Sequence, residues 1–118
     1  MELDILGQKY KVEIHKISED SYLEENGYCG YCSSMGKKII VADVSEKDYF
    51  PNMTSDEQEL YHKETLRHEI LHAFFRESGL DNSSNRSPNS WAKNEEMVDW
   101  FAIQAPKIFK AYQQANCL

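Results

Sequence analysis

The chain has 118 residues, of which 41% are hydrophobic and 28% charged, and its formal net charge at pH 7 is −7. This length predicts one domain over residues 1–118. The sequence has no apolar run near 18 residues and no basic leader, which predicts a cytoplasmic protein without a membrane span. The acidic balance argues against binding to nucleic acid or to an anionic membrane, which both need clustered Lys and Arg, so peptides and proteins are the expected partners.

The chain is predicted to begin with a β-hairpin over residues 2 to 17. Apolar and polar side chains alternate on both sides of a Gly7-Gln8 turn, which is the pattern of strands with one buried and one wet face. His15 falls on the polar side of this alternation. We therefore expect it to be a solvated strand residue.

A second hairpin is predicted from residues 27 to 32 and 37 to 43, after one helical turn in residues 20 to 26. Its return strand is apolar on both faces, as in a strand buried within a sheet. Cys29 and Cys32 have the spacing of a redox pair or of half a zinc knuckle. No second pair completes a knuckle and no strand-then-helix pattern surrounds them, so we expect reduced structural thiols.

A long helix is predicted after a loop at residues 45 to 52. Thr54 and Glu57 have the spacing of a capping box, which begins the helix, and Gly79 is expected to end it. His62 is expected at the surface. The predicted buried stripe of this helix consists of Leu66, Ile70, Leu71 and Phe74.

The same helix carries the run His68-Glu69-Ile70-Leu71-His72. Four residues span about 400° of rotation and roughly 6 Å of rise, so the two histidines lie one above the other and can grip one metal ion. Glu69 lies about 100° further round, where its carboxylate reaches a water at the metal rather than the metal itself. Neutral imidazoles suit Zn²⁺, which lowers the pKa of such a water. The motif predicts a zinc site with Glu69 as general base.

A polar stretch and a second helix are predicted to follow. Residues 80 to 90 are expected to form a flexible connector, with a lid over the site as the alternative. Ser90 is expected to cap a helix that starts at Trp91, and Pro106 must kink or end it, with further helix over residues 107 to 114. The aromatic residues expected in its core are Trp91, Trp100 and Phe101.

The second helix is predicted to supply the third metal ligand, Glu95. With 22 residues between Glu95 and His72, the chain can lay one helix across the other and complete a His₂Glu set with water as fourth ligand. Asp99 lies one turn further on the same face, where it can accept the spare N–H of a ligand histidine. The elements predict an α+β fold, in which a small, mainly antiparallel sheet from residues 1 to 43 packs on the two helices.

The pattern His-Glu-x-x-His followed by Asn-Glu-x-x-x-Asp resembles the zinc signature of the gluzincin metallopeptidases, over roughly residues 65 to 105. The short chain and the run from Glu95 to Phe101-Ala102 are similar to the ImmA/IrrE group of small bacterial and phage metallopeptidases, in which Ala-Asn often stands in place of Val98-Asp99. The resemblance implies zinc-dependent hydrolysis of peptide bonds, with a bacterial or phage regulator as substrate, and a sheet edge that receives the substrate backbone. The implied ligands are His68, His72 and Glu95, with Glu69 as base and Asp99 behind a ligand.

One catalytic group is missing from this pattern. Larger gluzincins place a His or Tyr after the third ligand to hold the oxyanion, but no histidine follows His72, and Tyr112 is the only tyrosine after Glu95. Tyr28 or Tyr31, or zinc alone, is left as the substitute. Two other functions therefore stay open: a weakly active or inactive zinc-containing binding module, and a metal hydrolase or metallochaperone with another substrate.

Overall fold

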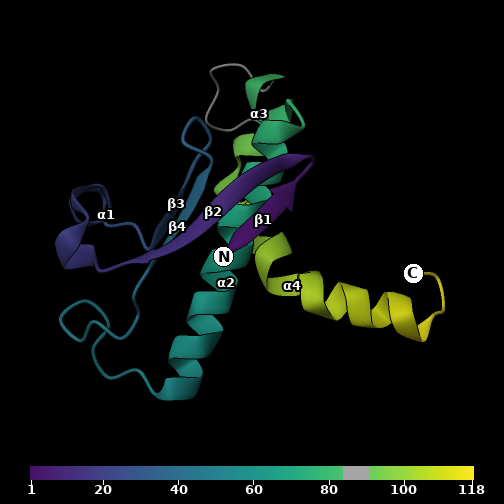
Figure 1. Cartoon of the computed structure of the whole chain (residues 1–118). Helices are drawn as coiled ribbons and strands as arrows, with labels where there is room; N and C mark the ends of the chain where they lie inside the picture. Colours follow the sequence, from purple (N-terminus) through teal and green to yellow (C-terminus); the bar gives the residue numbers. More distant parts are fainter. Residues whose placement is uncertain (84–90) are drawn as a thin grey trace.

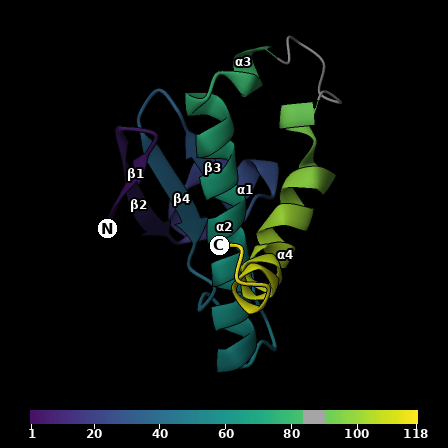
Figure 2. The ribbon, with the colours of Figure 1, turned by 90° about the vertical axis from the view of Figure 1, so that its right-hand side faces the viewer.

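The computed structural model describes residues 1–83 and 91–118, and the predicted α+β fold is confirmed. Four strands form one mixed sheet in the order β1-β2-β4-β3, and the long helix α2 lies across one face of it (Figures 1 and 2). Both predicted hairpins are present, and a parallel pairing of β2 with β4 joins them into one sheet. The strands are β1 (Glu2–Ile5), β2 (Gln8–His15), β3 (Gly30–Ser33) and β4 (Lys38–Ala42).

The inner strand β4 is buried on both faces, as its apolar sequence predicts. Ile39 and Val41 belong to the cluster on the face that α2 covers, and Ile40 and Ala42 pack on the opposite face with Leu23. These four side chains of β4 are each at most 2% exposed, whereas Lys38 at the start of the strand is exposed. The outer strand β3 pairs with the buried strand β4 on one side, and among the described residues its other edge is free of strand pairing.

Helix α2 (Ser55–Glu77) is fixed at both ends. At its start the capping box is complete: the Glu57 N–H donates to Oγ1 of Thr54 at 3.2 Å, and the Thr54 N–H donates to Oε2 of Glu57 at 2.8 Å. At its end Glu77 accepts a hydrogen bond of 2.7 Å from the hydroxyl of Tyr10, which is buried in β2. The helix is thus anchored to the sheet beyond the histidine motif.

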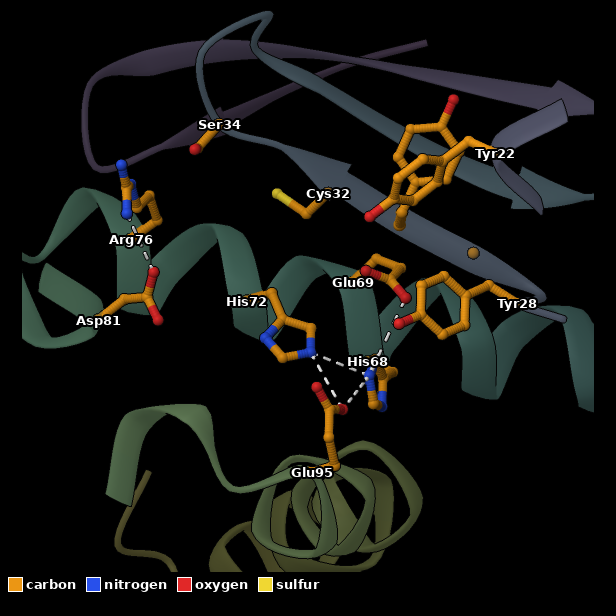
Figure 3. A pocket seen from close by; sticks show the side chains of 12 residues that line it. Tyr22, Tyr28, Cys32, Ser34, His68, Glu69, His72, Arg76, Asp81 and Glu95 are labelled. Carbon is orange, nitrogen blue, oxygen red and sulfur yellow. Dashed lines mark hydrogen bonds and ion pairs between the residues drawn. The ribbon is translucent and has the colours of Figure 1, made fainter. Parts of the chain in front are cut away.

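The buried face of α2 differs from the predicted stripe. Leu66 and Ile70 pack against the sheet, as predicted, but Phe74 is 37% exposed. The most buried side chains of α2 are Glu69 at 6% and Ala73 at 0%, and Glu69 faces the sheet (Figure 3). The helix lies so close to the strands that small Ala73, rather than bulky Phe74 about 100° away, occupies the central position.

The connection after α2 is partly helical. Leu80–Ser83 form the short helix α3, so the prediction of an irregular connector is wrong for these four residues. Residues 84–90, which include the predicted cap Ser90, lie outside the described residues.

Helix α4 (Glu95–Gln114) begins later than predicted. Trp91–Lys93 form a 3-10 turn, η2, and the side chain of Asn94 caps α4 by accepting a hydrogen bond of 2.8 Å from the Met97 N–H. Asn94 has the chemistry of a helix cap, as Ser90 does, and the cap of α4 is Asn94. The cap at Asn94 makes Glu95 the first residue of the helix.

Pro106 lies inside α4 and does not end it, because the helix continues to Gln114. The last part of α4 turns away from α2 (Figure 1). A proline has no N–H to donate to the carbonyl four residues earlier, which here belongs to Ala102. Arg67 of α2 donates its Nε–H to that carbonyl instead. This bond ties α4 to α2 directly beside the histidine motif.

The aromatic residues predicted in the core of α4 are exposed. Trp91, Trp100 and Phe101 are 57%, 53% and 38% exposed, whereas Val98 and Ala102 are buried. Because α4 packs through one narrow side, only the small residues of that side are covered. Along the described part of the chain, no helix has both the length and the apolar character that crossing a membrane requires.

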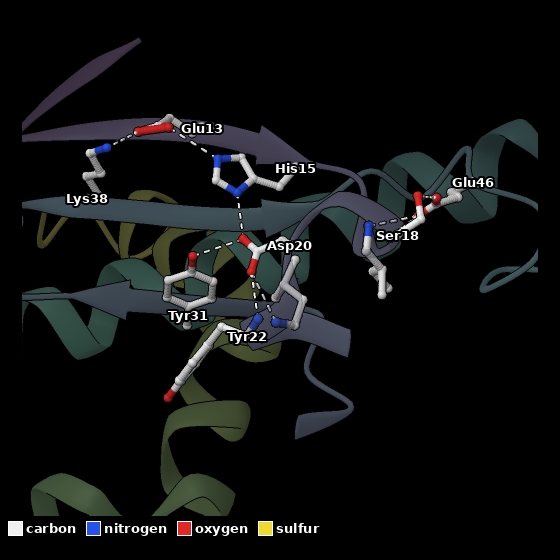
Figure 4. A network of polar contacts seen from close by, with 10 residues as sticks. Glu13, His15, Ser18, Asp20, Tyr22, Tyr31, Lys38 and Glu46 are labelled. Atoms are coloured by element: carbon white, nitrogen blue, oxygen red, sulfur yellow. Dashed lines mark hydrogen bonds and ion pairs between the residues drawn. The ribbon is translucent and has the colours of Figure 1, made fainter. Parts of the chain in front are cut away.

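His15 belongs to a polar network and is not simply solvated, which corrects the prediction (Figure 4). Its Nδ1 lies 2.6 Å from Oδ2 of Asp20, and its Nε2 lies 3.2 Å from Oε1 of Glu13. Asp20 also accepts a hydrogen bond from the Tyr31 hydroxyl at 2.9 Å and caps helix α1 (Ser21–Asn26). The hydrogen bond to Asp20 raises the pKa of His15, and burial only partly opposes it.

This network predicts a pH-dependent effect of His15→Gln. Because the folded state raises the pKa of His15, its contribution is complete below the unfolded pKa of about 6.5 and is lost as the pH rises through the folded value. The pKa of Asp20 is lowered, so the contribution of its carboxylate is lost only in acid, as the pH falls through the folded value. We expect His15→Gln to lower the free energy of unfolding by about 1 kcal/mol near pH 5.5 and by clearly less near pH 9.

Urea denaturation of both proteins at the two pH values measures this difference. His62→Gln, which changes a histidine outside the network, is the control. An equal loss for His15→Gln at both pH values would show that the charge of His15 does not contribute.

Candidate metal centre

Three side chains from two helices converge on one point. His68 and His72 project from the same side of α2, and Glu95 reaches them from the first turn of α4 (Figure 3). Nε2 of His68 lies 3.0 Å from Nε2 of His72 and 3.0 Å from Oε2 of Glu95. Nε2 of His72 lies 3.3 Å from the same oxygen. The structure therefore brings together the three side chains predicted as ligands.

The triangle formed by these three atoms fits one face of a tetrahedral metal site. Metal–ligand distances of about 2.0–2.1 Å, as for zinc, place the ligand atoms of a tetrahedron about 3.3–3.4 Å apart. The observed edges of 3.0 to 3.3 Å are close to this value. Two imidazoles and one carboxylate are also a donor set of catalytic zinc sites, in which the fourth position is open. These residues could hold a divalent metal such as zinc.

Asp99 sets the proton position of His68. Oδ1 of Asp99 lies 2.7 Å from Nδ1 of His68, so the carboxylate accepts the N–H of that nitrogen. The neutral ring then carries its lone pair on Nε2, which faces His72 and Glu95. Asp99 thus lies behind a candidate ligand histidine, as its spacing from Glu95 predicts.

Glu69 is the only buried carboxylate among the described residues. Its Oε1 lies 3.9 Å from Nε2 of His68, further than the edges of the ligand triangle. His68, Glu69 and His72 also form a group whose ligand atoms lie within 4.8 Å of one another, but Glu95 is the closer carboxylate. Burial raises the pKa of Glu69 to about 8, and the charges of Glu95 and Asp99 add to this. A carboxyl group that titrates near neutrality suits proton transfer.

Gly30 allows α2 to approach β3 at the position of Glu69. A Cβ atom on Gly30 would lie 3.0 Å from the carbonyl oxygen of Ile40, 3.0 Å from Cγ2 of Thr65 and 3.1 Å from Cγ of Glu69. Such contacts are tighter than ordinary packing allows, and one of them is with backbone. Sequence reasoning missed this residue because the contact joins positions 30 and 69 through space.

Two cavities meet at the candidate site. One has a volume of about 480 Å³ and extends along β3 towards Arg76 and Asp81. The other has a volume of about 320 Å³ and extends between β3 and α4 towards Tyr61 and Ile103. The two cavities adjoin at His68 and together form a groove along β3 and α2. The residues that line both cavities are Tyr28, Gly30, His68 and Glu69.

Cys29 and Cys32 are free thiols. Cys32 packs against the core cluster on the α2 side of the sheet, and Cys29 packs against the cluster on the opposite side. Cys29 accepts a hydrogen bond of 3.0 Å from the Tyr61 hydroxyl. Burial raises the pKa of Cys32 to about 12, so its thiol stays protonated at neutral pH and is a poor metal ligand or nucleophile. Both features agree with structural thiols.

No family model, no curated protein and no solved structure matches this chain. The resemblance to gluzincins and to the ImmA/IrrE group therefore stays a prediction from the sequence pattern. Function must be inferred from the chemistry of the groove and of the side chains that line it.

The two adjacent glutamates of α4 provide a direct test of the ligand set. Oε2 of Glu95 lies at the histidines, whereas Glu96 is exposed and lines a separate cavity. Loss of an outer partner such as Asp99 typically weakens metal binding about 10- to 100-fold. We expect Glu95→Gln to weaken zinc binding at least as much, and Glu96→Gln to leave it unchanged.

Zinc affinity is measured by competition with a chromophoric chelator, and zinc content by elemental analysis after desalting. The wild-type protein is expected to hold close to one zinc per chain, and His68→Ala and His72→Ala to lose it. Zinc binding that depends on Glu96 rather than on Glu95 would refute the ligand set.

Gly30→Ala is expected to destabilise the protein and to displace Glu69, because the new methyl group forces α2 away from β3. Overpacking of this kind typically costs about 1–3 kcal/mol of the free energy of unfolding. Gly36→Ala is the matched control, since its Cβ would meet only the side chain of Ser33. Urea denaturation of the three proteins measures the effect, and equal stability of both variants would contradict it.

Proposed function

We propose that this protein is a cytoplasmic, zinc-dependent metallopeptidase of the gluzincin type, similar to the ImmA/IrrE group, with a peptide or protein such as a bacterial or phage regulator as substrate. The observation that supports this most is the position of Glu69. It is a buried carboxyl group beside the His68/His72/Glu95 triangle, at the point where the two cavities adjoin.

The residues of the site have separate roles in this proposal. His68, His72 and Glu95 bind zinc, and Asp99 orients His68. When bound, zinc polarises the carbonyl of the substrate and makes water more acidic. Glu69 takes a proton from the attacking water on a carboxylate oxygen and passes it to the amine nitrogen as the C–N bond breaks. The products are a carboxylic acid and an amine, which ionise to a carboxylate and an ammonium group.

The free edge of β3 supports a peptide as the substrate. This strand is the last of the sheet, and both cavities lie along it. An extended peptide can add to such an edge by backbone hydrogen bonds, as in other cases of strand addition. A peptide in this position passes over Glu69 and the histidines, and the groove leaves room for residues on both sides of the cleaved bond.

A zinc-containing binding module without turnover is the alternative. It uses the same ligands and the same groove, but it does not need Glu69 as a base. A metal hydrolase with a different substrate, or a metallochaperone, would also share the ligands. Substitution of Glu69 therefore separates a peptidase from the binding module.

We expect Glu69→Gln to keep the zinc content and the melting temperature close to those of the wild type, because Glu69 is not in the ligand triangle. The substitution keeps the shape of the side chain and removes the proton acceptor. Loss of a general base typically lowers the rate about 10²- to 10⁴-fold. Hydrolysis of a peptide library, with and without a chelator, measures the rate.

Glu59→Gln is the matched control, since Glu59 is on the same helix, exposed, and lines neither cavity. If wild type and Glu69→Gln cleave the same peptide equally, Glu69 is structural and the mechanism is wrong. If the wild-type protein holds zinc and cleaves no peptide, the binding module is the better description.

A further inference from the structure

We propose that the hydroxyl group of Tyr28 stabilises the negative charge that develops on the carbonyl oxygen of the substrate. This inference rests on the proposed peptidase function. The sequence has no histidine after Glu95 that could take this role. The proposal assigns the role to Tyr28, which precedes α2 in the chain.

The position of Tyr28 carries the proposal. Tyr28 lines both cavities, together with Gly30, His68 and Glu69, so it stands where the two halves of the groove meet. Figure 3 shows its hydroxyl directed towards Glu69 and His68. The side chain is 47% exposed, and among the described residues its hydroxyl has no hydrogen-bond partner. A substrate oxygen at this point can therefore accept its hydrogen.

The local structure holds Tyr28 in this direction. Helix α1 ends at Gly27, which adopts the left-handed conformation with φ of 65°. The N–H of Tyr28 donates to the carbonyl of Leu23 at 3.1 Å. The ring of Tyr22 packs against that of Tyr28 with centroids 5.9 Å apart. The backbone and the ring are thus positioned before any substrate binds, which is what electrostatic stabilisation of a transition state requires.

The other tyrosines near the groove are less suited. The hydroxyl of Tyr31 donates to Asp20 in the polar network, and that of Tyr61 donates to Sγ of Cys29. Tyr112 is near the end of α4, beyond Pro106, and lines neither cavity.

Tyr22 differs from Tyr28 in its distance from the junction of the cavities. It lines only the larger cavity, and its ring packs on that of Tyr31 with centroids 4.7 Å apart. Tyr22 is therefore the best control for Tyr28: it is an exposed tyrosine of the same cavity wall that does not reach the second cavity.

The role of Tyr28 in the reaction is to donate a hydrogen bond. Water adds to the carbonyl carbon and gives a proton to Glu69, while the π electron pair of the C=O bond moves onto oxygen. The Tyr28 O–H meets the charge at that oxygen and keeps its own proton. When the pair returns, the C–N bond breaks and the nitrogen takes the proton from Glu69. Because the charge is larger in the transition state than in the substrate, the bond is stronger there.

The test is Tyr28→Phe in the full zinc-loaded chain, which keeps the ring and removes the hydroxyl. With the library peptide that the wild type cleaves fastest, we expect kcat to fall about 100-fold, and KM and zinc content to stay within about twofold. The phosphinic analogue of that peptide, which carries a tetrahedral anion in place of the cleaved bond, should bind weaker by a similar factor. Tyr112→Phe, which changes a tyrosine that lines neither cavity, should bind and cleave as well as the wild type. Tyr22→Phe, which removes a hydroxyl from the wall of the larger cavity alone, should lose far less of kcat than Tyr28→Phe.

Each other outcome overturns the inference. An unchanged kcat, or a raised KM with unchanged kcat, would mean that Tyr28 contributes only to substrate binding or to nothing. An equal loss of kcat in Tyr22→Phe would point to general disturbance of the wall. If the wild-type protein cleaves no peptide, the proposed function fails and this inference fails with it, whereas a cleaving wild type with an equally active Tyr28→Phe overturns the inference alone.

Discussion

The close contact between α2 and β3 at Gly30 is the constraint on which the candidate site depends. Because Gly30 has no side chain, the helix approaches the strand until Glu69 lies between them, buried against backbone. A carboxyl group in that position has a raised pKa and stands beside the two histidines rather than in solvent. The same contact places the proposed base next to the candidate ligands and at the point where the two cavities adjoin.

The second half of the site is built by α4, and two local features place it. Asn94 caps the helix so that Glu95 is its first residue and Asp99 follows one turn later, both towards α2. Pro106 leaves the carbonyl of Ala102 without an intrahelical donor, and Arg67 supplies one from α2. Pro106 thus interrupts the hydrogen bonds within α4 and frees the acceptor that joins the two helices. The donor, Arg67, directly precedes His68 in the chain.

The two faces of the sheet carry different features, a polar network on one and the wall of the groove on the other, and both lie next to β3. On the face away from α2, Asp20 holds His15, Tyr31 and the start of α1 in one network. On the groove side, α1 and the turn at Gly27 place Tyr22 and Tyr28 at the free edge of β3. The polar network reaches the larger cavity through Tyr31, and it supports the wall against which a peptide would lie.

Sequence alone determined the features that depend on short spacing. The two hairpins, the capping box at Thr54 and the common face of His68 and His72 follow from the periods of strand and helix, which the backbone sets locally. The approach of Glu95 was also predictable, because a polar connector lets the second helix fold back.

Only the tertiary structure decided which surfaces are buried and which residues touch across the chain. Phe74, Trp100 and Phe101 are apolar enough for a core, but α2 and α4 pack through narrow strips of other side chains and leave these three exposed. Gly30 against Glu69, and Arg67 against Ala102, join positions more than 30 residues apart, so no local pattern announces them. Whether a tyrosine could serve the site depended likewise on where its hydroxyl points, which is a property of the folded chain and not of its spacing.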